Sequence, residues 1–338
     1  MIDIAVIGTG RIGTHHVRAL AEDVPEARVV AVVDPAIDRA SDLAERHSIP
    51  HALEDLSQAL DLESLDAVVI STPLPTHVPL IQQAAGAGLH VFTEKPIAGS
   101  VGEARLAVEA AERAGVVFQV GFNRRFAESW ALSHEIVRDG GVGAIHRIHS
   151  LTRDPGPFTA DPTRIAHGTI FRETLIHDFD TIGWFMGSAK PVSVHATADA
   201  LIRPDARSTG FLDTSVVTIR YDDGAIATAE ASFSAVYGYD VRGEVLGSEG
   251  MVQMGSVPSS AARHFDATGM HARTEGLDTT RFHGAYVAEF SAFARAVGGD
   301  ELPGRPTGAD GLAAQRVAEA AILSHAERRE VLVEEVDR

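Results

Sequence analysis

Apolar and polar positions alternate regularly over the first 122 residues. Short apolar runs, typical of strands buried on both faces, are separated by segments whose apolar residues recur at helical spacing. This alternation predicts a doubly wound parallel sheet with helices on both of its faces. The predicted strands are 4–7, 29–33, 67–71, 89–93 and 116–120, and the predicted helices are 12–21, 36–46, 76–87 and 101–114.

The pattern changes after Gly121. A Pro-, Gly- and Thr-rich stretch, 154–168, is too long for a simple connection and is typical of a functional loop. Tyr221-Asp222-Asp223-Gly224 is a hairpin signal between two alternating segments, so the second sheet is expected to be mostly antiparallel. The predicted helices here are 128–138, 171–185, 286–297 and 308–325, and the predicted strands are 145–151, 192–201, 213–221, 226–233, 239–246 and 331–336.

Length, charge and cysteine usage limit the class of protein. A chain of 338 residues suits two domains, predicted as a dinucleotide-binding domain over 1–122 and a substrate-binding and oligomerisation domain over 123–338. The net charge of −18 argues against nucleic acid or an anionic membrane as a partner. Zero cysteines exclude disulfides and thiol nucleophiles and are compatible with a cytoplasmic location. The N-terminal segment is typical of neither a secretion signal nor a membrane span.

A glycine-rich turn stands between the first predicted strand and the first predicted helix. Gly8 suits the tight turn, Gly10 lets backbone approach a pyrophosphate, and Gly13 allows close helix–strand packing. Asp34 ends the second strand, where a carboxylate takes the adenosine ribose hydroxyls and repels a 2′-phosphate, so NAD is favoured over NADP. Arg39 lies one turn into the next helix and is expected to face solvent.

Three further residues carry the candidate chemistry. Lys95 is one of only two lysines in a chain with 29 basic residues, and its compact ammonium can hold an alcohol oxygen or pass a proton. Glu173 and His177 have i, i+4 spacing, which places them on one face of a predicted helix. An isolated pair of this kind is usually a solvated helix pair, and the other motifs of the chain are what favour catalysis. His146 and His149 would point to opposite faces of a strand, so no metal site is predicted.

These motifs together resemble the glucose–fructose oxidoreductase/inositol dehydrogenase (Gfo/Idh/MocA) family, and within it most closely the inositol 2-dehydrogenases. The resemblance implies a Rossmann domain, an α/β domain with a large open sheet, and oligomers formed through that sheet. The matching segments cover nearly the whole chain: Gly8 to Gly13, Thr72-Pro73-Leu74-Pro75-Thr76-His77, Glu94-Lys95-Pro96, Gly121-Phe122-Asn123-Arg124-Arg125-Phe126, Arg153-Asp154-Pro155, Ile176-His177-Asp178-Phe179-Asp180, Tyr237-Gly238-Tyr239-Asp240 and Gly308-Ala309-Asp310-Gly311.

The resemblance assigns catalytic roles to Lys95, Glu173 and His177. Oxidation of a secondary alcohol requires a group that removes the hydroxyl proton, and an imidazole suits that role near neutral pH. Glu173 would orient His177, and Lys95 would stabilise the developing alkoxide. The family usually has Asp at position 173, and the extra methylene of Glu could displace the carboxylate by about 1.5 Å.

The same resemblance predicts two sets of ligand contacts. Arg125 is expected to have a structural role and not to contact a ligand. Four histidines are expected to be packing or surface residues: His15, His16, His146 and His149. Asp178 and Tyr239 are expected to neighbour the substrate. The predicted cofactor contacts are Gly8, Gly10, Arg11, Ile12, Gly13, Asp34, Thr72, Pro73, His77, Glu94, Lys95, Asn123 and Arg124, and the predicted substrate contacts are Lys95, Asn123, Asp154, Glu173, His177 and Tyr237.

The sequence therefore predicts a cytoplasmic, NAD-dependent oxidoreductase that acts on a secondary hydroxyl of a cyclic polyol, with myo-inositol favoured. Two alternatives remain: a dehydrogenase of a pyranose or anhydrosugar, and a non-catalytic NAD-binding regulator. A homo-oligomer, dimer or tetramer, is expected to form through a flat sheet face that carries the alternating small residues Ala225, Ala227, Ala229 and Ala231.

Overall fold

The computed structural model describes residues 1–337 and divides into two compact units. The first unit comprises Met1–Ala127 and Phe282–Leu312, and the second comprises Glu128–Arg281 and the chain from Ala313 onward. This division differs from the predicted domains 1–122 and 123–338 because helix α9 (His283–Val297) belongs to the first unit. Its Phe290 and Phe293 pack against Phe92 in tilted and edge-to-face arrangements, with ring centroids 4.9 and 5.8 Å from that of Phe92.

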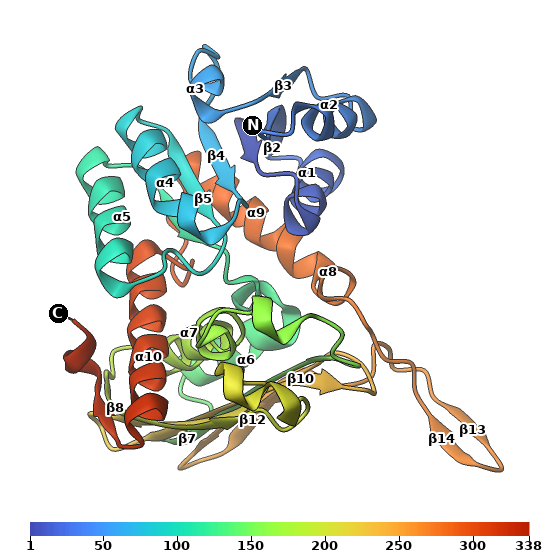
Figure 1. The fold of residues 1–338 in the computed structure, drawn as a ribbon, viewed down its shortest axis with the longest axis vertical. Helices are drawn as coiled ribbons and strands as arrows, with labels where there is room; N and C mark the ends of the chain where they lie inside the picture. The colour runs from blue at the N-terminus through green and yellow to red at the C-terminus, as the bar shows by residue number, and fades with distance from the viewer. Residues whose placement is uncertain (338) are drawn as a thin grey trace. The chain divides into compact units, whose positions relative to one another are not determined.

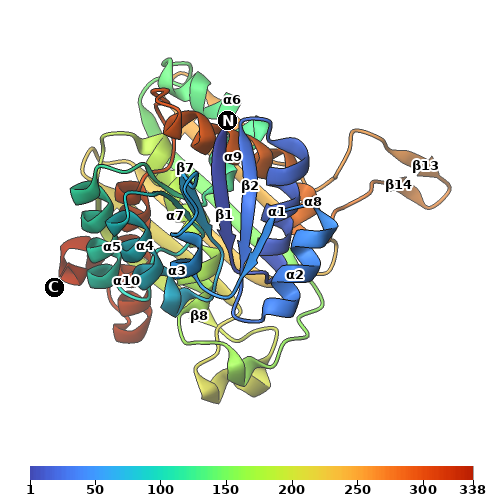
Figure 2. The same ribbon diagram turned by 90° about the horizontal axis from the view of Figure 1, so that it is seen from above.

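The first unit is built on a six-stranded parallel sheet with the order β3-β2-β1-β4-β5-β6, which confirms the predicted class. Helices α1, α2 and α9 cover one face, and α4 and α5 lie on the other (Figures 1 and 2). The strands are β1 (Ile2–Ile7), β2 (Ala27–Val33), β3 (His51–Leu53), β4 (Ala67–Ile70), β5 (His90–Thr93) and β6 (Phe118–Val120). The other helices are α1 (Arg11–Asp23), α2 (Ile37–Arg46), α3 (Leu56–Ala59), α4 (His77–Gly86) and α5 (Val101–Ala114).

Local sequence explains the ends of α5, a helix whose predicted range matches its observed bounds. The Ser100 hydroxyl caps the first turn by accepting a hydrogen bond from the Glu103 amide. Gly115 ends the helix in the left-handed region, at φ 65°, where glycine avoids a side-chain clash.

The second unit is built on a seven-stranded sheet with the order β12-β11-β7-β10-β9-β8-β15. Only β7 and β10 pair in parallel, and the predicted hairpin at Tyr221–Gly224 joins antiparallel β9 and β10. The strands are β7 (Ile145–Pro155), β8 (Pro191–Asp199), β9 (Thr214–Tyr221), β10 (Ile226–Ala235), β11 (Asp240–Gly247), β12 (Met251–Met254) and β15 (Val331–Leu332). The main helices are α6 (Glu128–Arg138), α7 (Ile176–Met186) and the greater part of α10 (Gly308–Glu327).

The alternating alanines of β10 lie on the covered face of this sheet. Ala227, Ala229 and Ala231 have no exposed surface, and α7 packs against their strand. The prediction that this small-residue face contacts another subunit is therefore wrong, because it receives the subunit's own helix. The exposed face is the opposite one, where Ile226 and Val216 are 47% and 48% exposed.

A narrow hairpin, which the sequence pattern did not indicate, extends from the second unit (Figure 1). It consists of β13 (His264–Asp266) and β14 (Gly269–His271), and all six of these residues are exposed. Strands of three residues carry too few positions for an alternation to be recognised. Within residues 1–337, no helix has the length and apolar character needed to cross a bilayer.

Candidate active site

The carboxyl ends of the parallel strands bring the first set of predicted residues to one sheet edge. Backbone hydrogen bonds continue the ladder beyond the strands, from Gly8 N to Val33 O, Ser71 N to Ile7 O and Glu94 N to Ile70 O. The fingerprint turn, the loop after β4 and the loop after β5 therefore follow one another along this edge. The strand order reverses between β1 and β4, and ligands of doubly wound sheets bind outside such a point.

The three fingerprint glycines serve different purposes. Gly8 has φ +99°, and a Cβ there would lie 2.7 Å from the Ser71 carbonyl oxygen. A Cβ on Gly13 would lie 2.0 Å from the carbonyl oxygen of Gly8, so the fold requires both glycines. A Cβ on Gly10 would meet no atom within 4 Å. Since the fold itself leaves room there, the missing side chain at Gly10 fits a pyrophosphate that approaches the backbone at the start of α1.

Asp34 is held in its ionised form beside this turn. Its carboxylate accepts hydrogen bonds from the Thr9 amide at 2.8 Å, the Thr9 hydroxyl at 2.6 Å and the Ala36 amide at 2.9 Å. Burial favours the neutral acid, but the hydrogen bonds from Thr9 and Ala36 outweigh it and hold the pKa of Asp34 below its ordinary value. Arg39 is exposed as predicted, and its guanidinium donates a hydrogen bond to the Thr9 carbonyl.

His77 joins the two loops after β4 and β5, both of which carry predicted cofactor contacts. The ring is 2% exposed, with Nδ1 2.9 Å from the Pro96 carbonyl oxygen and Nε2 2.9 Å from the Thr72 carbonyl oxygen. Burial lowers the pKa of His77, although the two carbonyl groups oppose this shift. The ring thus positions the Thr72–Pro73 segment relative to the Lys95 loop, and its direct contact with a cofactor stays a prediction.

Glu94 forms a buried pair with His16. Its Oε1 lies 2.7 Å from His16 Nε2, and its Oε2 accepts a hydrogen bond from the Lys95 amide at 3.2 Å. Burial disfavours the charge, but the His16 hydrogen bond and the charge of Lys95 outweigh it and lower the pKa of Glu94. A Cβ on Gly121 would lie 3.1 Å from Oε2, so glycine leaves room for the carboxylate. The hydrogen bond from the Lys95 amide to Glu94 thus fixes the backbone of the half-buried Lys95.

Sequence reasoning missed the role of His16, which it assigned to packing or the surface. The residue is fully buried, and its ring lies 4.8 Å from that of Phe290 and 5.4 Å from that of Tyr286. A signal was available, because the buried positions of α1 include Gly13, His16, Val17 and Leu20. A polar residue on an apolar helix face requires a partner, although spacing alone cannot identify it.

We expect His16→Phe to lower the free energy of unfolding by about 3 kcal/mol, because it keeps an aromatic ring but removes the side-chain partner of Glu94 Oε1. Denaturant unfolding measures this loss. His146→Phe, on an exposed position of β7, is the matched control and should change stability by less than about 0.5 kcal/mol. Because the pKa of Glu94 is lowered, its contribution is present above the ordinary glutamate pKa and is lost as the pH falls through the folded value.

The double variant His16→Phe/Glu94→Leu removes the buried charge as well and should recover at least half of the loss. Wild-type stability of the single variant would contradict the pairing.

In the second unit, Glu173 and His177 lie on either side of a change in helix type. Residues Ile170–Thr174 form a π-helical turn, in which the Leu175 amide donates to the Ile170 carbonyl at 3.0 Å, and α7 begins at Ile176. The predicted helix over 171–185 is therefore two elements, and the regular i, i+4 geometry does not apply across them. Glu173 is exposed and His177 is half-buried. Single π turns are rare and are frequent at functional sites.

The first turn of α7 is anchored to the sheet next to His177. Asp178 is fully buried, and its carboxylate accepts hydrogen bonds from the hydroxyls of Ser150 at 2.5 Å and Thr152 at 2.6 Å, both on β7. This contact anchors the helix, and the expectation that Asp178 neighbours the substrate stays a prediction. Ile176 is also fully buried, so both chain neighbours of His177 are fixed.

Tyr237 belongs to a polar network at the end of β7. Its hydroxyl donates to Asp240 at 2.8 Å and accepts from Arg153 at 3.0 Å, while the residue remains 42% exposed. Burial opposes the charge of Asp240, but Arg242 and Tyr237 outweigh it and lower the pKa of Asp240. Asp154 follows Arg153 on the same strand. A substrate contact by Asp154 or by the Tyr237 ring stays a prediction, whereas Tyr239 is buried.

Arg125 is structural, as predicted. It forms an ion pair with Asp310 at 3.0 Å and donates to the Gly304 carbonyl. In the same motif as Asp310, a Cβ on Gly308 would lie 2.6 Å from the Phe118 ring, so this segment is a packing motif. Asn123 and Arg124 are buried in the neighbouring 3₁₀ turn, η2 (Asn123–Phe126), and their ligand contacts stay predictions.

The first unit thus carries the fingerprint turn, Asp34, the Thr72–Pro73 loop and Lys95, while the second carries Asp154, Glu173, His177 and Tyr237. Backbone donors at a helix start suit a dinucleotide, and an imidazole suits proton transfer. In comparisons with known families, residues 2–122 match the oxidoreductase family described as an NAD-binding Rossmann fold, and residues 130–253 match the GFO/IDH/MocA C-terminal domain.

Individual relatives agree with both domain matches. The scyllo-inositol 2-dehydrogenase (NAD(+)) of Bacillus subtilis is 35% identical over 88% of this chain and 87% of its own length. The myo-inositol 2-dehydrogenase of Thermotoga maritima is 33% identical over 98% of this chain and 99% of its own. The crystal structure of Lactobacillus casei scyllo-inositol dehydrogenase with NAD(H) and scyllo-inositol superposes with a TM-score of 0.93, at 28% identity and 99% coverage of both chains. Because the matches extend through both domains, this chain belongs to the Gfo/Idh/MocA family of NAD-dependent oxidoreductases.

Proposed function

We propose that this enzyme oxidises a secondary hydroxyl of a cyclic polyol, with myo-inositol as the leading candidate. The observation that carries the proposal is His177, an imidazole in a helical turn anchored through Asp178, in a chain that also retains Lys95 and the complete fingerprint turn. The names of the relatives in B. subtilis, T. maritima and L. casei support an inositol as the substrate.

The cofactor-binding residues would be those at the edge of the first sheet. Backbone amides of the Gly8–Gly13 turn, including those of Arg11 and Ile12, suit the pyrophosphate at the start of α1. The ionised Asp34 suits the adenosine ribose hydroxyls, and the Thr72–Pro73 loop suits the nicotinamide end. NAD, when bound, supplies the acceptor for the hydride of the carbinol carbon.

Three side chains would accept the proton and stabilise the charge that develops on the substrate. His177 accepts the hydroxyl proton as general base, and Glu173 orients the imidazole and stabilises its protonated form. Lys95 donates a hydrogen bond to the alkoxide oxygen as negative charge develops there. Its backbone is held by Glu94, so the ammonium starts from a fixed loop. The roles of these three residues are part of the proposal.

A substrate screen tests this function. The purified protein is incubated with NAD and each of myo-inositol, scyllo-inositol, glucose and an anhydrosugar, and NADH absorbance is followed. We expect an inositol to give the highest kcat/KM. A higher value with glucose or the anhydrosugar would support the pyranose alternative instead. NAD binding without turnover on any compound would support the regulator alternative.

We expect NAD to be preferred over NADP by at least about tenfold in kcat/KM, equivalent to about 1.4 kcal/mol. The ionised Asp34 would repel a 2′-phosphate, and Arg39, although close to the turn, is engaged by the Thr9 carbonyl. Asp34→Ser should reduce this preference, while Asp38→Ser, on an exposed position of α2, should not. Equal efficiencies with the two cofactors in the unchanged protein would refute the assignment of Asp34.

We also propose that the enzyme is a cytoplasmic homotetramer assembled through the exposed face of the second sheet. Val216, Ile226 and Leu246, on three strands, are 38–48% exposed on this face. Polar side chains lie between them, such as Arg147 between Leu246 and Ile226, so this face suits an interface of mixed apolar and polar contacts. Light scattering at micromolar concentration tests the assembly, for which a monomer would be the contrary result, and cell fractionation tests the location.

A further inference from the structure

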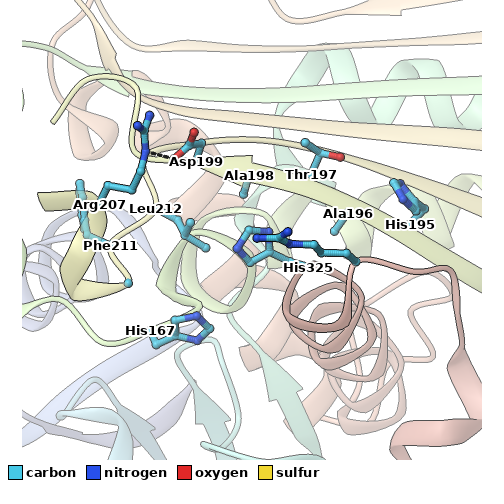
Figure 3. A pocket seen from close by; sticks show the side chains of 12 residues that line it. His167, His195, Ala196, Thr197, Ala198, Asp199, Arg207, Phe211, Leu212 and His325 are labelled. Carbon is cyan, nitrogen blue, oxygen red and sulfur yellow. Dashed lines mark hydrogen bonds and ion pairs between the residues drawn. The ribbon is translucent and has the colours of Figure 1, made fainter. Parts of the chain in front are cut away.

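A cavity of about 530 Å³ lies in the second unit, beside the C-terminal end of α10. Its walls come from β8, from η5 (Pro204–Thr209) and the loop that follows it, from His167, and from α10 with the residue after it (Figure 3). The side chains that could carry positive charge here are His167, His195, Arg207, His325 and Arg328. The single carboxylate among the lining residues is Asp199, in a chain whose net charge is −18.

Most of these positive groups have no anionic partner. Asp199 is engaged by Arg207 at 2.7 Å, as the dashed line in Figure 3 shows. Within residues 1–337, the side chains of Arg328, His167 and His195 form neither an ion pair nor a hydrogen bond. Burial and the nearby charges of His167 and Arg328 lower the pKa of His325, while Asp199 opposes the shift. The positive charges of His167, His325 and Arg328 therefore repel one another, and an anion in the cavity would relieve this repulsion.

The position of Arg328 is unusual for the end of a helix. It directly follows α10 and has φ 56°, a left-handed conformation that glycine usually supplies at this position. Cations near a helix C-terminus are ordinarily explained by the helix dipole. That explanation does not cover His167, which comes from another element and lines the same cavity. His195 is also part of the lining, but it pairs with Thr218 and projects from the exposed face of the sheet. Strained conformations of non-glycine residues are concentrated at functional sites.

The remaining walls are apolar. Ala196 and Phe211 are buried, and Ala198 and Leu212 complete this part of the lining. The volume lies within the range of about 300–1,000 Å³ that is typical of small-molecule sites. An arginine fork with neighbouring imidazoles suits a phosphate group, and the apolar wall suits the carbon skeleton that carries it.

We propose that this cavity binds the phosphate group of a small phosphorylated metabolite. The site lies wholly in the second unit and shares no residue with the fingerprint turn, and it does not depend on the proposed substrate of the enzyme.

Calorimetric titration of the full-length protein tests the proposal with inorganic phosphate as the probe. Saturating NAD is present throughout, so that the dinucleotide site is occupied. We expect binding by the unchanged protein and at least about tenfold weaker binding by Arg328→Ala, which removes a charge-assisted contact. Arg138→Ala is the matched control, because Arg138 is also exposed, lies on α6 of the same unit and is outside the cavity, and it should leave phosphate affinity unchanged.

The pH dependence gives a second readout. Affinity should fall as the pH rises through the pKa of His325, which burial holds below its ordinary value, because the positive charge of the imidazole is lost there. The charged groups that face His325 are His167, Arg328 and the Arg207–Asp199 pair, and the two arginines and the aspartate keep their charge at that pH. His325→Ala should weaken binding and flatten the dependence.

Two probes distinguish the sources of the phosphate group. Tighter binding of glucose 6-phosphate than of inorganic phosphate identifies a phosphorylated metabolite, whereas equal binding identifies the free ion and overturns the metabolite assignment. No binding of either probe at millimolar concentration, or unchanged affinity in Arg328→Ala, would overturn the site itself.

Discussion

Replacing His177 with alanine should lower turnover on the best substrate by about 100-fold or more, while NAD affinity stays near that of the unchanged protein. The imidazole is the proposed proton acceptor and acts on the substrate, so its loss should affect kcat and not dinucleotide binding. The anchoring of α7 through Asp178 to Ser150 and Thr152 is untouched, and the helix should keep its position. Steady-state kinetics and calorimetric NAD titration measure the two effects.

His146→Ala provides the comparison for this variant, because it removes an exposed histidine from β7 in the same unit. We expect it to retain full activity. Retention of more than half of the original turnover by His177→Ala would mean that another group accepts the proton.

A second large effect is expected at Lys95. Lys95→Arg keeps the positive charge but should lower kcat by about 100-fold, because a planar guanidinium cannot reproduce a compact ammonium beside the reacting oxygen. The Glu94 carboxylate binds the backbone amide of residue 95, so the loop itself should be little disturbed. Steady-state rates with saturating NAD measure the change.

The chain offers a natural control in its only other lysine, Lys190, which is exposed. Lys190→Arg should leave kcat unchanged. If Lys95→Arg retained near-normal kcat, simple positive charge would suffice at this position and the proposed role of a compact donor would be wrong.

The alternation of apolar runs predicted most elements of both sheets, because buried strands and amphipathic helices have distinct periods. It did not reveal β3 or the β13–β14 hairpin, whose strands are too short for a period to emerge. It also did not show that α9 packs with the first unit, since an amphipathic face does not identify its partner. The alanines of β10 illustrate the same limit: their spacing indicated a flat face but not what covers it.

The candidate site was likewise only partly predictable from the sequence. Local motifs located the fingerprint turn, the Lys95 loop and the Glu173–His177 segment. The contacts that hold these segments were not predictable, because His16 with Glu94, and His77 with the carbonyls of Thr72 and Pro96, are joined only by the tertiary fold. The hydrogen bonds from Ser150 and Thr152 to Asp178 were not predictable for the same reason.

The π turn at Ile170–Thr174 has a further consequence for protein engineering. A turn closed by an i, i+5 hydrogen bond contains one more residue than an α-helical turn. Compared with a regular α-helix, this turn therefore contains one additional residue. The Asp178 contact still holds α7 against β7. Deleting one residue of this turn should convert it to ordinary helix and rotate the Glu173 side chain by about 100° relative to His177. The length of this segment, and not only its composition, therefore sets the direction of the acidic side chain.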